Sequence, residues 1–426
     1  MFSKKTRISL LSLAIFTIHG VGTSAHAAEP ADILSTYADI AEAGYQDSLA
    51  TAKSLKEAIN SFTNNPTDET LAAARTAWVD ARAPYQQTEA YRFGNVLVDE
   101  WEGKVNAWPL DEGLIDYVDT DAYGDGSDEN AFYTANIIAN EKLTIAGQEI
   151  DATNITPDLL RSLHEIDDVE ANVATGYHAI EFLLWGQDTN GTDAGAGNRA
   201  ATDFATGDAC TNGHCDRRIA YLVAATDLLI SDLEEMAAAW GPNGNARAAL
   251  GTDKQGLATI LTGMGSLSYG ELAGERMRLG LMLHDPEEEH DCFSDNTHNS
   301  HYYDALGIAN VYKGSYTRID GSKVEGASLS DLVRTLAPEL DAEMQAKLAA
   351  TEAAMTVLKE TADKGEQSYD QMIGENNEAG NAIVQAAIDG LVDQTKTIER
   401  IVAAIELDKI EIEGSDSLDN PEAVFQ

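Results

Sequence analysis

Apolar residues recur every three to four positions along most of the chain, which is the period of a helix with one buried face. This pattern predicts helices over residues 31–62, 67–98, 217–240, 257–283, 329–373 and 379–407. Thr67 and the two acidic residues after it suit a helix N-terminus, and Pro84 predicts a kink or break within the second helix. Alternation with a period of two is almost absent, so we expect an all-α protein built from helical bundles.

Three stretches break this pattern. Residues 101–156 are rich in aromatic residues and aspartate and are expected to form an ordered excursion, whereas 191–213 and 284–327 are expected to be long polar loops. The length fits two domains or one elongated domain. We expect a first helical bundle at 28–205, a second at 206–413 and a frayed tail at 414–426, with the functional site between helices.

The first residues have the features of a secretory signal peptide. Lys4, Lys5 and Arg7 precede an apolar segment over 8–18 that is too short to span a bilayer, and an Ala-His-Ala cleavage site ends at residue 27. No later segment has the roughly 18 uninterrupted apolar residues of a spanning helix. We therefore expect residues 1–27 to be removed and the rest to be a soluble protein exported to the periplasm, without a transmembrane segment.

The formal charge of −44 restricts the partners of this chain. Such a polyanion repels nucleic acids and anionic lipids, so neither is expected as a partner. The charge could serve to capture cations, or it could simply keep the protein soluble in salty surroundings. A hydrophobic content of 43% is ordinary for a globular protein and argues against a disordered acidic chain.

Three cysteines leave one thiol without a partner in an exported protein. Cys210 and Cys215 bracket a short turn and are expected to form a local disulfide in an oxidising compartment. The alternative is a soft-metal site that includes His214, although a fourth ligand is not obvious. Cys292 would remain unpaired.

One helical segment places an imidazole and a carboxylate on the same face. His178 and Glu181 stand three positions apart within residues 176–186, among large apolar side chains. These neighbours predict that the shared face is buried, and a buried ionisable pair is costly unless something compensates it. A bound metal would do so. The alternative is a core hydrogen bond that ties helices together.

A third metal ligand must come from another element. We expect Glu89, which shares a face of the neighbouring predicted helix with Arg92. Imidazole together with carboxylates suits iron, zinc or manganese rather than copper(I). Arg92 is expected to orient a carboxylate or to hold an anion.

Two further groups are candidates for supporting roles. Glu275 and Arg276 are adjacent on a predicted helix and either face the site or form an ion pair within the fold. The segment 290–301 is dense in ligand-type side chains, including Asp295 and His298. These side chains either bind the metal or form a network that replaces missing backbone partners in a long loop.

Motifs of common hydrolases are missing from the sequence. A zinc protease usually carries H-E-x-x-H, and the inverted form needs a histidine directly after the glutamate, where Phe182 follows Glu181. A G-x-S-x-G motif is also absent. The sequence therefore offers a candidate metal site without an evident catalytic base.

Three longer motifs are specific enough to suggest a protein family. Gly176-x-His178-x-x-Glu181 continues as Phe-Leu-Leu-Trp-Gly-Gln-Asp, and residues 81–93 read Ala-Arg-x-Pro-Tyr-x-x-Thr-Glu-x-x-Arg-Phe. Gly-Glu-Arg-Met at 274–277 precedes Cys-Phe-Ser-Asp-Asn-Thr-His at 292–298. These motifs resemble those of the imelysin family, also called peptidase family M75, and the last resembles its iron-regulated protein A branch. The resemblance covers essentially the whole chain after the signal peptide.

The resemblance implies a two-domain helical fold with its site between bundles, and a role in iron acquisition. It implies His178 and Glu181 as the signature metal residues, and it brings Arg82, inside the upstream motif, near the site. We expect an iron-binding protein whose ligand is a metal ion or an iron-bearing small molecule, and whose partner is an outer-membrane or periplasmic uptake protein. The family was named for an insulin-cleaving protease, so the alternative is a zinc-dependent peptidase that uses the same residues.

Overall fold

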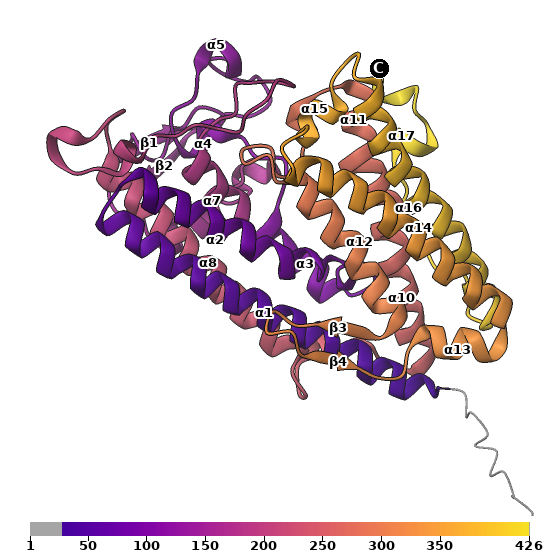
Figure 1. Cartoon of the computed structure of the whole chain (residues 1–426). Helices are drawn as coiled ribbons and strands as arrows, with labels where there is room; N and C mark the ends of the chain where they lie inside the picture. Colours follow the sequence, from indigo (N-terminus) through magenta and orange to yellow (C-terminus); the bar gives the residue numbers. More distant parts are fainter. Residues whose placement is uncertain (1–27, 426) are drawn as a thin grey trace, which may run out of the picture.

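The computed structural model describes residues 28–425, which form a helical protein with two short β-hairpins (Figure 1). The predicted all-α class is confirmed. The predicted signal peptide at 1–27 lies outside the described residues.

The long helices form two sets that lie side by side (Figure 1). The first set contains α1 (Pro30–Asn64), α2 (Asp68–Gln86), α3 (Val96–Asn106), α7 (Gly176–Trp185) and α8 (Cys215–Trp240). The second contains α10 (Asp253–Ser266), the π-helical η5 (Leu267–Arg278), α12 (Thr297–Lys313), α14 (Pro338–Asp363) and α16 (Glu378–Ala404).

Shorter helices connect these elements. They are α4 (Glu112–Ile115), α5 (Thr120–Tyr123), α6 (Pro157–Leu163), α9 (Asn245–Ala248), α11 (Leu279–Leu283), α13 (Leu329–Leu336), α15 (Tyr369–Ile373) and α17 (Asp416–Asp419). The 3-10 turns are η1 (Glu89–Tyr91), η2 (Ile166–Asp168), η3 (Ala201–Phe204), η4 (Gly207–Ala209), η6 (Pro286–Glu288) and η7 (Ala423–Phe425).

Several helix boundaries follow from residues that the sequence singles out. Thr67 accepts a hydrogen bond from the backbone of Thr70 and caps α2, as predicted. The second helix was expected to reach residue 98, which is wrong, because α2 ends at Gln86. Pro84 lies in the last turn of α2. The hydroxyl of Thr88 donates a hydrogen bond to the Tyr85 carbonyl at 2.6 Å, so a side chain binds a carbonyl at the end of the helix.

Three other predicted boundaries need correction. The expected loop at 284–327 contains α12, a helix of 17 residues. The expected helix over 329–373 is divided into α13, α14 and α15, with Pro338 at the first position of α14 and Gly365 at φ +66° just after its end. The tail expected to be frayed includes α17, whose Ser417 donates to the Gly274 carbonyl at 3.0 Å.

The two hairpins were not predicted. β1 (Lys142–Ile145) pairs antiparallel with β2 (Gln148–Asp151), and β3 (Ser315–Thr317) pairs antiparallel with β4 (Lys323–Glu325). The second hairpin lies along α1 (Figure 1), where the buried carboxylate of Asp47 accepts hydrogen bonds from its residues. Strands this short give little period-two signal, which explains why the pattern missed them.

The two sets of helices share one connected hydrophobic core. Contacts of α2 with α12 and of α1 with α10 join the sets. Helix α8, which was expected in the second domain, packs against α1 and α7 of the first set. The division into two domains at 205/206 stays a prediction.

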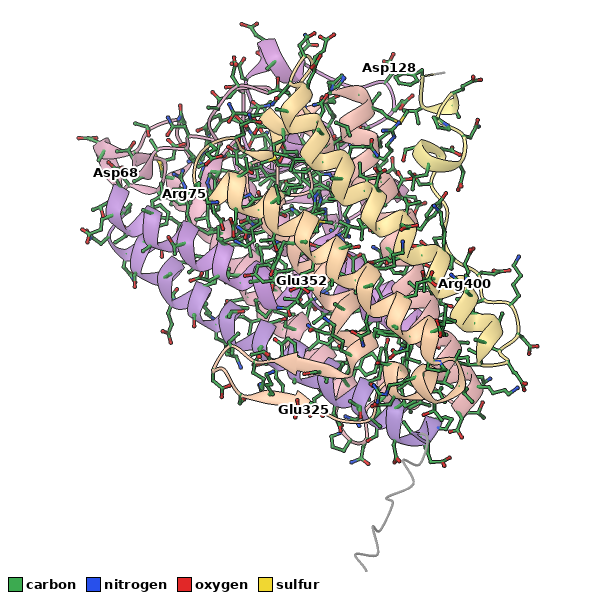
Figure 2. The ribbon with its side chains drawn as sticks, turned by 45° about the vertical axis from the view of Figure 1, so that its right-hand side comes forward. Asp68, Arg75, Asp128, Glu325, Glu352 and Arg400 are labelled. Carbon is green, nitrogen blue, oxygen red and sulfur yellow. A yellow bond between two sulfur atoms is a disulfide. The ribbon has the colours of Figure 1, made fainter. Side chains whose placement is uncertain are left out.

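Charged side chains cover the exposed faces of the long helices, as Glu352 on α14 and Arg400 on α16 illustrate (Figure 2). No described helix is long and apolar enough to cross a membrane.

Candidate metal centre

Helix α7 carries the paired imidazole and carboxylate, and both of its ends are fixed by neighbours. Gly176 opens the helix at φ +82°, and a Cβ there would lie 2.4 Å from the carbonyl oxygen of Val105 on α3. Glycine is therefore required for this approach. Near the other end, Arg75 on α2 donates two hydrogen bonds to the Leu184 carbonyl. The position of α7 is thus set by α2 and α3.

His178 is fully buried and uses one of its two ring nitrogens. Nδ1 lies 3.1 Å from Oε2 of Glu181, and Nε2 has no hydrogen-bond partner among the described residues. Burial lowers the pKa of His178 well below its ordinary value, and the nearby charge of Arg82 adds to this effect. The Nε2 lone pair is available to a cation in the tautomer whose Nδ1–H donates to ionised Glu181.

Glu181 is equally buried and both of its oxygens have partners. Oε1 accepts hydrogen bonds from the backbone N–H of Ser294 at 3.0 Å and from its hydroxyl at 2.6 Å. Burial raises the pKa of Glu181 well above its ordinary value, and Asp291 raises it further. In this arrangement Glu181 orients His178, whereas the sequence led us to expect it as a metal ligand.

Asp291 reaches the same place from the segment between η6 and α12. Its carboxylate forms an ion pair with Arg82 at 2.8 Å, and it accepts hydrogen bonds from Asn296 at 2.8 Å and Ser300 at 2.5 Å. Burial acts to raise the pKa of Asp291, but the Arg82 charge and the hydrogen bonds outweigh it and hold the pKa below its ordinary value. Asp291 is therefore a carboxylate anion in a dry interior.

His290 adds a second imidazole beside the first. The ring centroids of His290 and His178 are 4.8 Å apart, and His290 Nε2 lies 3.3 Å from Nδ2 of Asn106. The side-chain carbonyl of Asn106 in turn accepts a hydrogen bond from Arg82 at 2.6 Å. Burial lowers the pKa of His290 well below its ordinary value, and Arg276 adds to this effect. Both imidazoles are thus neutral near pH 7.

His178, His290 and Asp291, which we call the His/Asp group, each offer one ligand atom, and these atoms lie within 4.8 Å of one another. All three residues are buried. Two imidazoles and one carboxylate are a donor set that suits iron or zinc. The residues present therefore fit a metal of this kind.

A cleft of about 670 Å³ leads to this group, with His290 and Asn106 on its wall. Among its lining residues, carboxylates outnumber the two basic side chains, Arg92 and Arg276. The carboxylates are Asp99, Glu100, Glu102, Glu165, Glu170, Glu271, Glu275 and Glu288. Low-dielectric walls with charge of one sign concentrate counter-ions, so this cleft attracts cations.

A second ionic network lies on the cleft and holds several residues that the sequence assigned to the metal. Arg276 forms ion pairs with Glu89 at 2.9 Å, Glu271 at 2.7 Å and Asp304 at 3.1 Å, and Arg92 lies 3.4 Å from Glu271. Glu89 is therefore paired with an arginine and is not a member of the His/Asp group. Because α2 ends before it, Glu89 lies in η1, which packs against α12.

The other predicted supporting residues also lie apart from the His/Asp group. Nδ1 of His298 lies 3.0 Å from the Asp295 carbonyl oxygen, and its Nε2 lies 3.3 Å from the Asp363 carboxylate. Glu275 is exposed on the rim of the cleft. Of the residues expected to support the metal, Arg82 alone contacts a member of the group, because it holds Asp291.

A model of the imelysin family, peptidase family M75, matches residues 41–398. The chain belongs to the imelysin family. It is 37% identical over 71 residues to an iron-regulated protein A of Synechococcus elongatus, and this segment spans 16% of the chain and 20% of that relative.

Two solved structures share the imelysin fold of this chain. One is an iron-regulated protein A precursor from Parabacteroides distasonis, with a TM-score of 0.64 and 17% identity over 90% of this chain and 97% of that one. The other is an imelysin-like protein from Psychrobacter arcticum, with a TM-score of 0.54 and 14% identity over 89% of this chain and 97% of that one.

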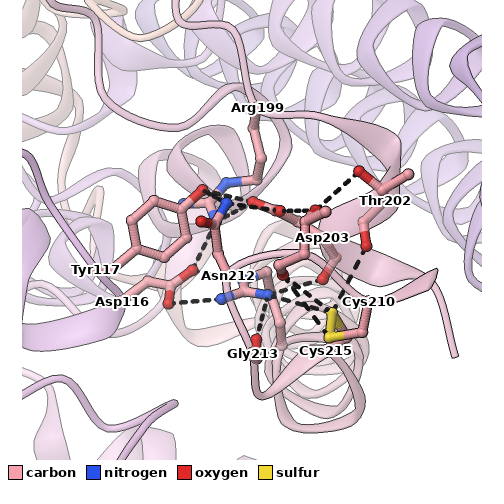
Figure 3. Close-up of a disulfide and its surroundings, with 11 residues drawn as sticks. Asp116, Tyr117, Arg199, Thr202, Asp203, Cys210, Asn212, Gly213 and Cys215 are labelled. Carbon is pink, nitrogen blue, oxygen red and sulfur yellow. Dashed lines mark hydrogen bonds and ion pairs between the residues drawn. A yellow bond between two sulfur atoms is a disulfide. The ribbon is translucent and has the colours of Figure 1, made fainter. Parts of the chain in front are cut away.

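In this imelysin-family chain a disulfide joins Cys210 and Cys215, as predicted, so these sulfurs are not metal ligands (Figure 3). It lies beside a buried ionic network in which Asp116 accepts from Arg199 and Arg218, each at 2.6 Å. The backbone N–H of Arg199 donates to the last carbonyl of α7 at 2.7 Å. The network therefore supports the C-terminal end of the helix that carries His178.

Sequence reasoning missed the exact partners of His178. His290 and Asp291 belong to the segment 290–301, which was recognised as rich in ligand-type residues, but Asp295 and His298 were chosen from it. Asn106 gave no signal. Spacing along one helix identified the pair on α7, whereas the other ligands depend on how a distant segment folds back.

Proposed function

We propose that this chain is an exported iron-binding protein that takes part in iron uptake, with the His/Asp group as its metal ligands. The observation that carries the proposal is the grouping of buried His178, His290 and Asp291, which offer one ligand atom each within 4.8 Å of one another, while Nε2 of His178 has no hydrogen-bond partner among the described residues. An unpartnered polar atom in a dry interior is costly, and a metal ion would compensate it.

The chemistry of the donors supports iron as the metal. Two histidines with one carboxylate is the ligand set of many non-haem iron sites, and it is shared with some zinc sites. The names of relatives add weight to iron, because two of them are called iron-regulated protein A. Glu181 would keep His178 in the tautomer that presents Nε2, and the acidic cleft would raise the local concentration of the cation.

Substitution of His178 tests this proposal. We expect His178→Ala to lower the iron content of anaerobically reconstituted protein at least tenfold, measured by elemental analysis, while the helical circular dichroism stays unchanged. His298→Ala is the matched control, because His298 contacts Asp363 outside the group. Equal iron content in the two variants would remove His178 from the site.

A zinc-dependent peptidase is the second candidate, because three protein ligands with an open position are typical of catalytic zinc. The geometry favours it less, since both Glu181 oxygens are engaged by His178 and Ser294 and neither is left to activate a water molecule. Incubation of zinc-loaded protein with an unfolded polypeptide separates the candidates. Turnover that disappears in Glu181→Gln would favour the peptidase.

Export is the third part of the proposal. We infer that residues 1–27 direct the chain to the periplasm or outer membrane, where an uptake protein would receive the metal. N-terminal sequencing of protein from the native compartment tests this part, with Ala28 as the expected first residue. An intact N-terminus in protein from the cytoplasm would contradict it.

A further inference from the structure

Six carboxylates gather around a second, smaller cavity near the His/Asp group, and we call them the acidic cluster. They come from α4, from the loop after α7, from η6 and the segment that follows it, and from α15. The six are Glu112, Asp188, Glu287, Glu289, Asp295 and Asp370. Glu112, Asp188, Glu287 and Glu289 line a small cavity together with Cys292.

Several oxygens of this cluster have no hydrogen-bond partner although they are buried. Glu289 is 1% exposed and its Oε2 is unpartnered, and this side chain lines the cavity. Oδ2 of Asp370, which is also 1% exposed, and Oδ1 of Asp295 are unpartnered as well. The cavity holds about 10 Å³, which is close to the room that one water molecule or one small ion needs. A buried, unpartnered carboxylate oxygen of Glu289 at such a space, with those of Asp295 and Asp370 in the same cluster, points to a cation.

The cluster has little compensating positive charge: Arg199 lowers the pKa of Glu112, but burial and Glu287 outweigh this effect. None of the six carboxylates forms an ion pair with a basic residue in the part of the chain that the structure describes. The charged neighbours that act on Glu287 and Asp295 are all carboxylates, and burial with these neighbours raises the pKa of each to about 7. A buried acid normally has an arginine, a lysine or a metal beside it.

We propose that the acidic cluster is a second metal site, distinct from the His/Asp group, and that it binds calcium. The donors on offer are carboxylate oxygens, which hard cations prefer, and they include no imidazole. Calcium accepts six to eight oxygens in flexible geometry, whereas magnesium demands a near-ideal octahedron. Ligands drawn from four separate segments suit the less demanding ion.

The carboxylates must move slightly to hold the ion. Among the described residues, three or more ligand atoms lie within 4.8 Å of one another at the His/Asp group alone. Repulsion between like charges explains why the acids of the cluster stand farther apart. Glu287 is exposed on the single turn η6 and is free to approach Glu289 once a cation removes this repulsion.

Calcium at this place would stabilise the iron site. Glu289 and Asp295 lie on either side of His290 and Asp291 in the chain, and Asp188 lies three residues after the end of α7. A cation shared by these carboxylates ties the segment that carries two ligands to the helix that carries the third. The bound ion would therefore hold the two halves of the His/Asp group together.

Titration of chelator-treated protein with calcium chloride tests the proposal. We expect a dissociation constant in the range of about 10⁻⁴–10⁻³ M by calorimetry, as in other low-affinity calcium modules. At a hundredfold excess over this constant, Tm should rise on the order of 3 °C. Magnesium at the same concentration should give a smaller rise, and an equal rise would overturn the assignment to calcium.

Two variants and one control locate the ion. The double substitution Glu289→Gln with Asp295→Asn should fold without calcium, because it relieves repulsion, and should bind calcium at least tenfold more weakly. Asp370→Asn, on α15, should weaken binding in the same direction. Glu325→Gln is the matched control, since Glu325 is exposed on β4, at the opposite end of the molecule from α4 and α15 (Figure 1), and should leave calcium binding unchanged.

Calcium binding to the acidic cluster can be tested independently of iron binding to the His/Asp group. His178→Ala should keep the full response to calcium, because His178 contributes no atom to the acidic cluster. Absence of any calcium-dependent shift in the wild-type chain up to about 10 mM, ten times the upper end of the expected range, would overturn the proposal. An undiminished shift in the double variant would overturn it as well.

Discussion

The His/Asp group and the acidic cluster are built partly from the same stretch of chain, residues 285–296, and they balance buried charge in different ways. In the His/Asp group, Asp291 is paired with Arg82 at 2.8 Å, and the two imidazoles are neutral. In the acidic cluster, buried oxygens of Glu289 and Asp370 have neither a basic partner nor a hydrogen bond.

This difference separates a site that is already organised from one that depends on an ion. Arg82, Asn296 and Ser300 hold the Asp291 carboxylate before any metal arrives. In the acidic cluster, neutral side chains donate hydrogen bonds to Glu112, Asp188 and Asp370, but no basic side chain forms an ion pair with any of the six carboxylates among the described residues. These carboxylates therefore repel one another until a cation joins them. Substitutions in the two regions should therefore change stability in opposite directions.

The largest effect is expected from removal of the charge that balances Asp291. Arg82→Met leaves a fully buried carboxylate without its partner, so the free energy of unfolding should fall by about 3–5 kcal/mol. Urea denaturation at pH 7 measures this loss. The control is Arg400→Met, whose exposed ion pair with Glu343 on the surface of α16 should be worth about 0–1 kcal/mol (Figure 2). A loss for Arg82→Met no larger than that of the control would contradict the assigned charge balance.

A smaller loss is expected at the start of α7. Gly176→Ala places a methyl group 2.4 Å from the Val105 carbonyl oxygen at φ +82°, and should cost about 2–3 kcal/mol. Gly191, beside the acidic cluster, also has a positive φ of +63°, but a Cβ there meets nothing within 4 Å. Gly191→Ala should therefore cost only the conformational strain of about 1–2 kcal/mol. Equal losses in thermal denaturation would show that backbone strain alone, and not the contact with α3, fixes Gly176.

Removal of a charge from the acidic cluster should raise the free energy of unfolding of the calcium-free protein. Burial, with help from Glu287, raises the pKa of Glu112 from 4.5 to about 8. The pKa of Glu112 is therefore higher in the folded chain than in the unfolded chain. Its contribution to the free energy of unfolding is fully present below pH 4.5 and is lost as the pH rises through about 8. Glu112→Gln should therefore stabilise the calcium-free protein by about 1 kcal/mol at pH 8.

Unfolding measured at pH 5 and pH 8 checks the sign of this prediction. The wild-type chain should lose more stability between these two values than Glu112→Gln does. Glu325→Gln, on the exposed β4 strand, is the reference for a change of charge without burial. If Glu112→Gln were destabilising at pH 8, the folded protein would have to stabilise the charge of the Glu112 carboxylate. The acidic cluster would then not differ from Asp291, whose charge Arg82 balances.

The smallest loss of stability is expected for a substitution of Ser294, which holds Glu181 in place beside His178. Ser294→Ala removes the hydroxyl that donates to Glu181 at 2.6 Å but leaves the backbone N–H that donates at 3.0 Å. The loss of stability should be about 1 kcal/mol. Iron affinity should fall about tenfold, because Glu181 no longer holds His178 as firmly. Competitive titration against a chelator measures the affinity, and an unchanged value would assign Glu181 a structural role only.

The sequence predicted the helices whose signals are local. Thr67 caps α2 through a hydrogen bond to a backbone N–H three residues away, so no distant contact is needed to recognise it. Helix α12 was missed because its first turns carry Thr297, Asn299 and His301, which resemble a loop. Their polarity reflects their place beside the metal centre and not exposure to solvent, since Thr297 and His301 are buried.

The candidate site was predicted in part for the same reason. His178 and Glu181 belong to one helix, and their spacing alone places them together. The choice of Glu89 as a third ligand relied on a helix that ends three residues earlier, and the pairing of Glu89 with Arg276 joins positions 187 residues apart. No periodicity reports such a contact. The same holds for Arg82 and Asp291, which are separated by 209 positions.

Anomalous scattering at the iron edge from crystals of the iron-loaded protein tests the central claim most directly. The account predicts one strong peak in contact with His178, His290 and Asp291, and its loss in crystals of His178→Ala. A peak at the Arg276 network, at the acidic cluster alone or on the surface, with none beside His178, would contradict it.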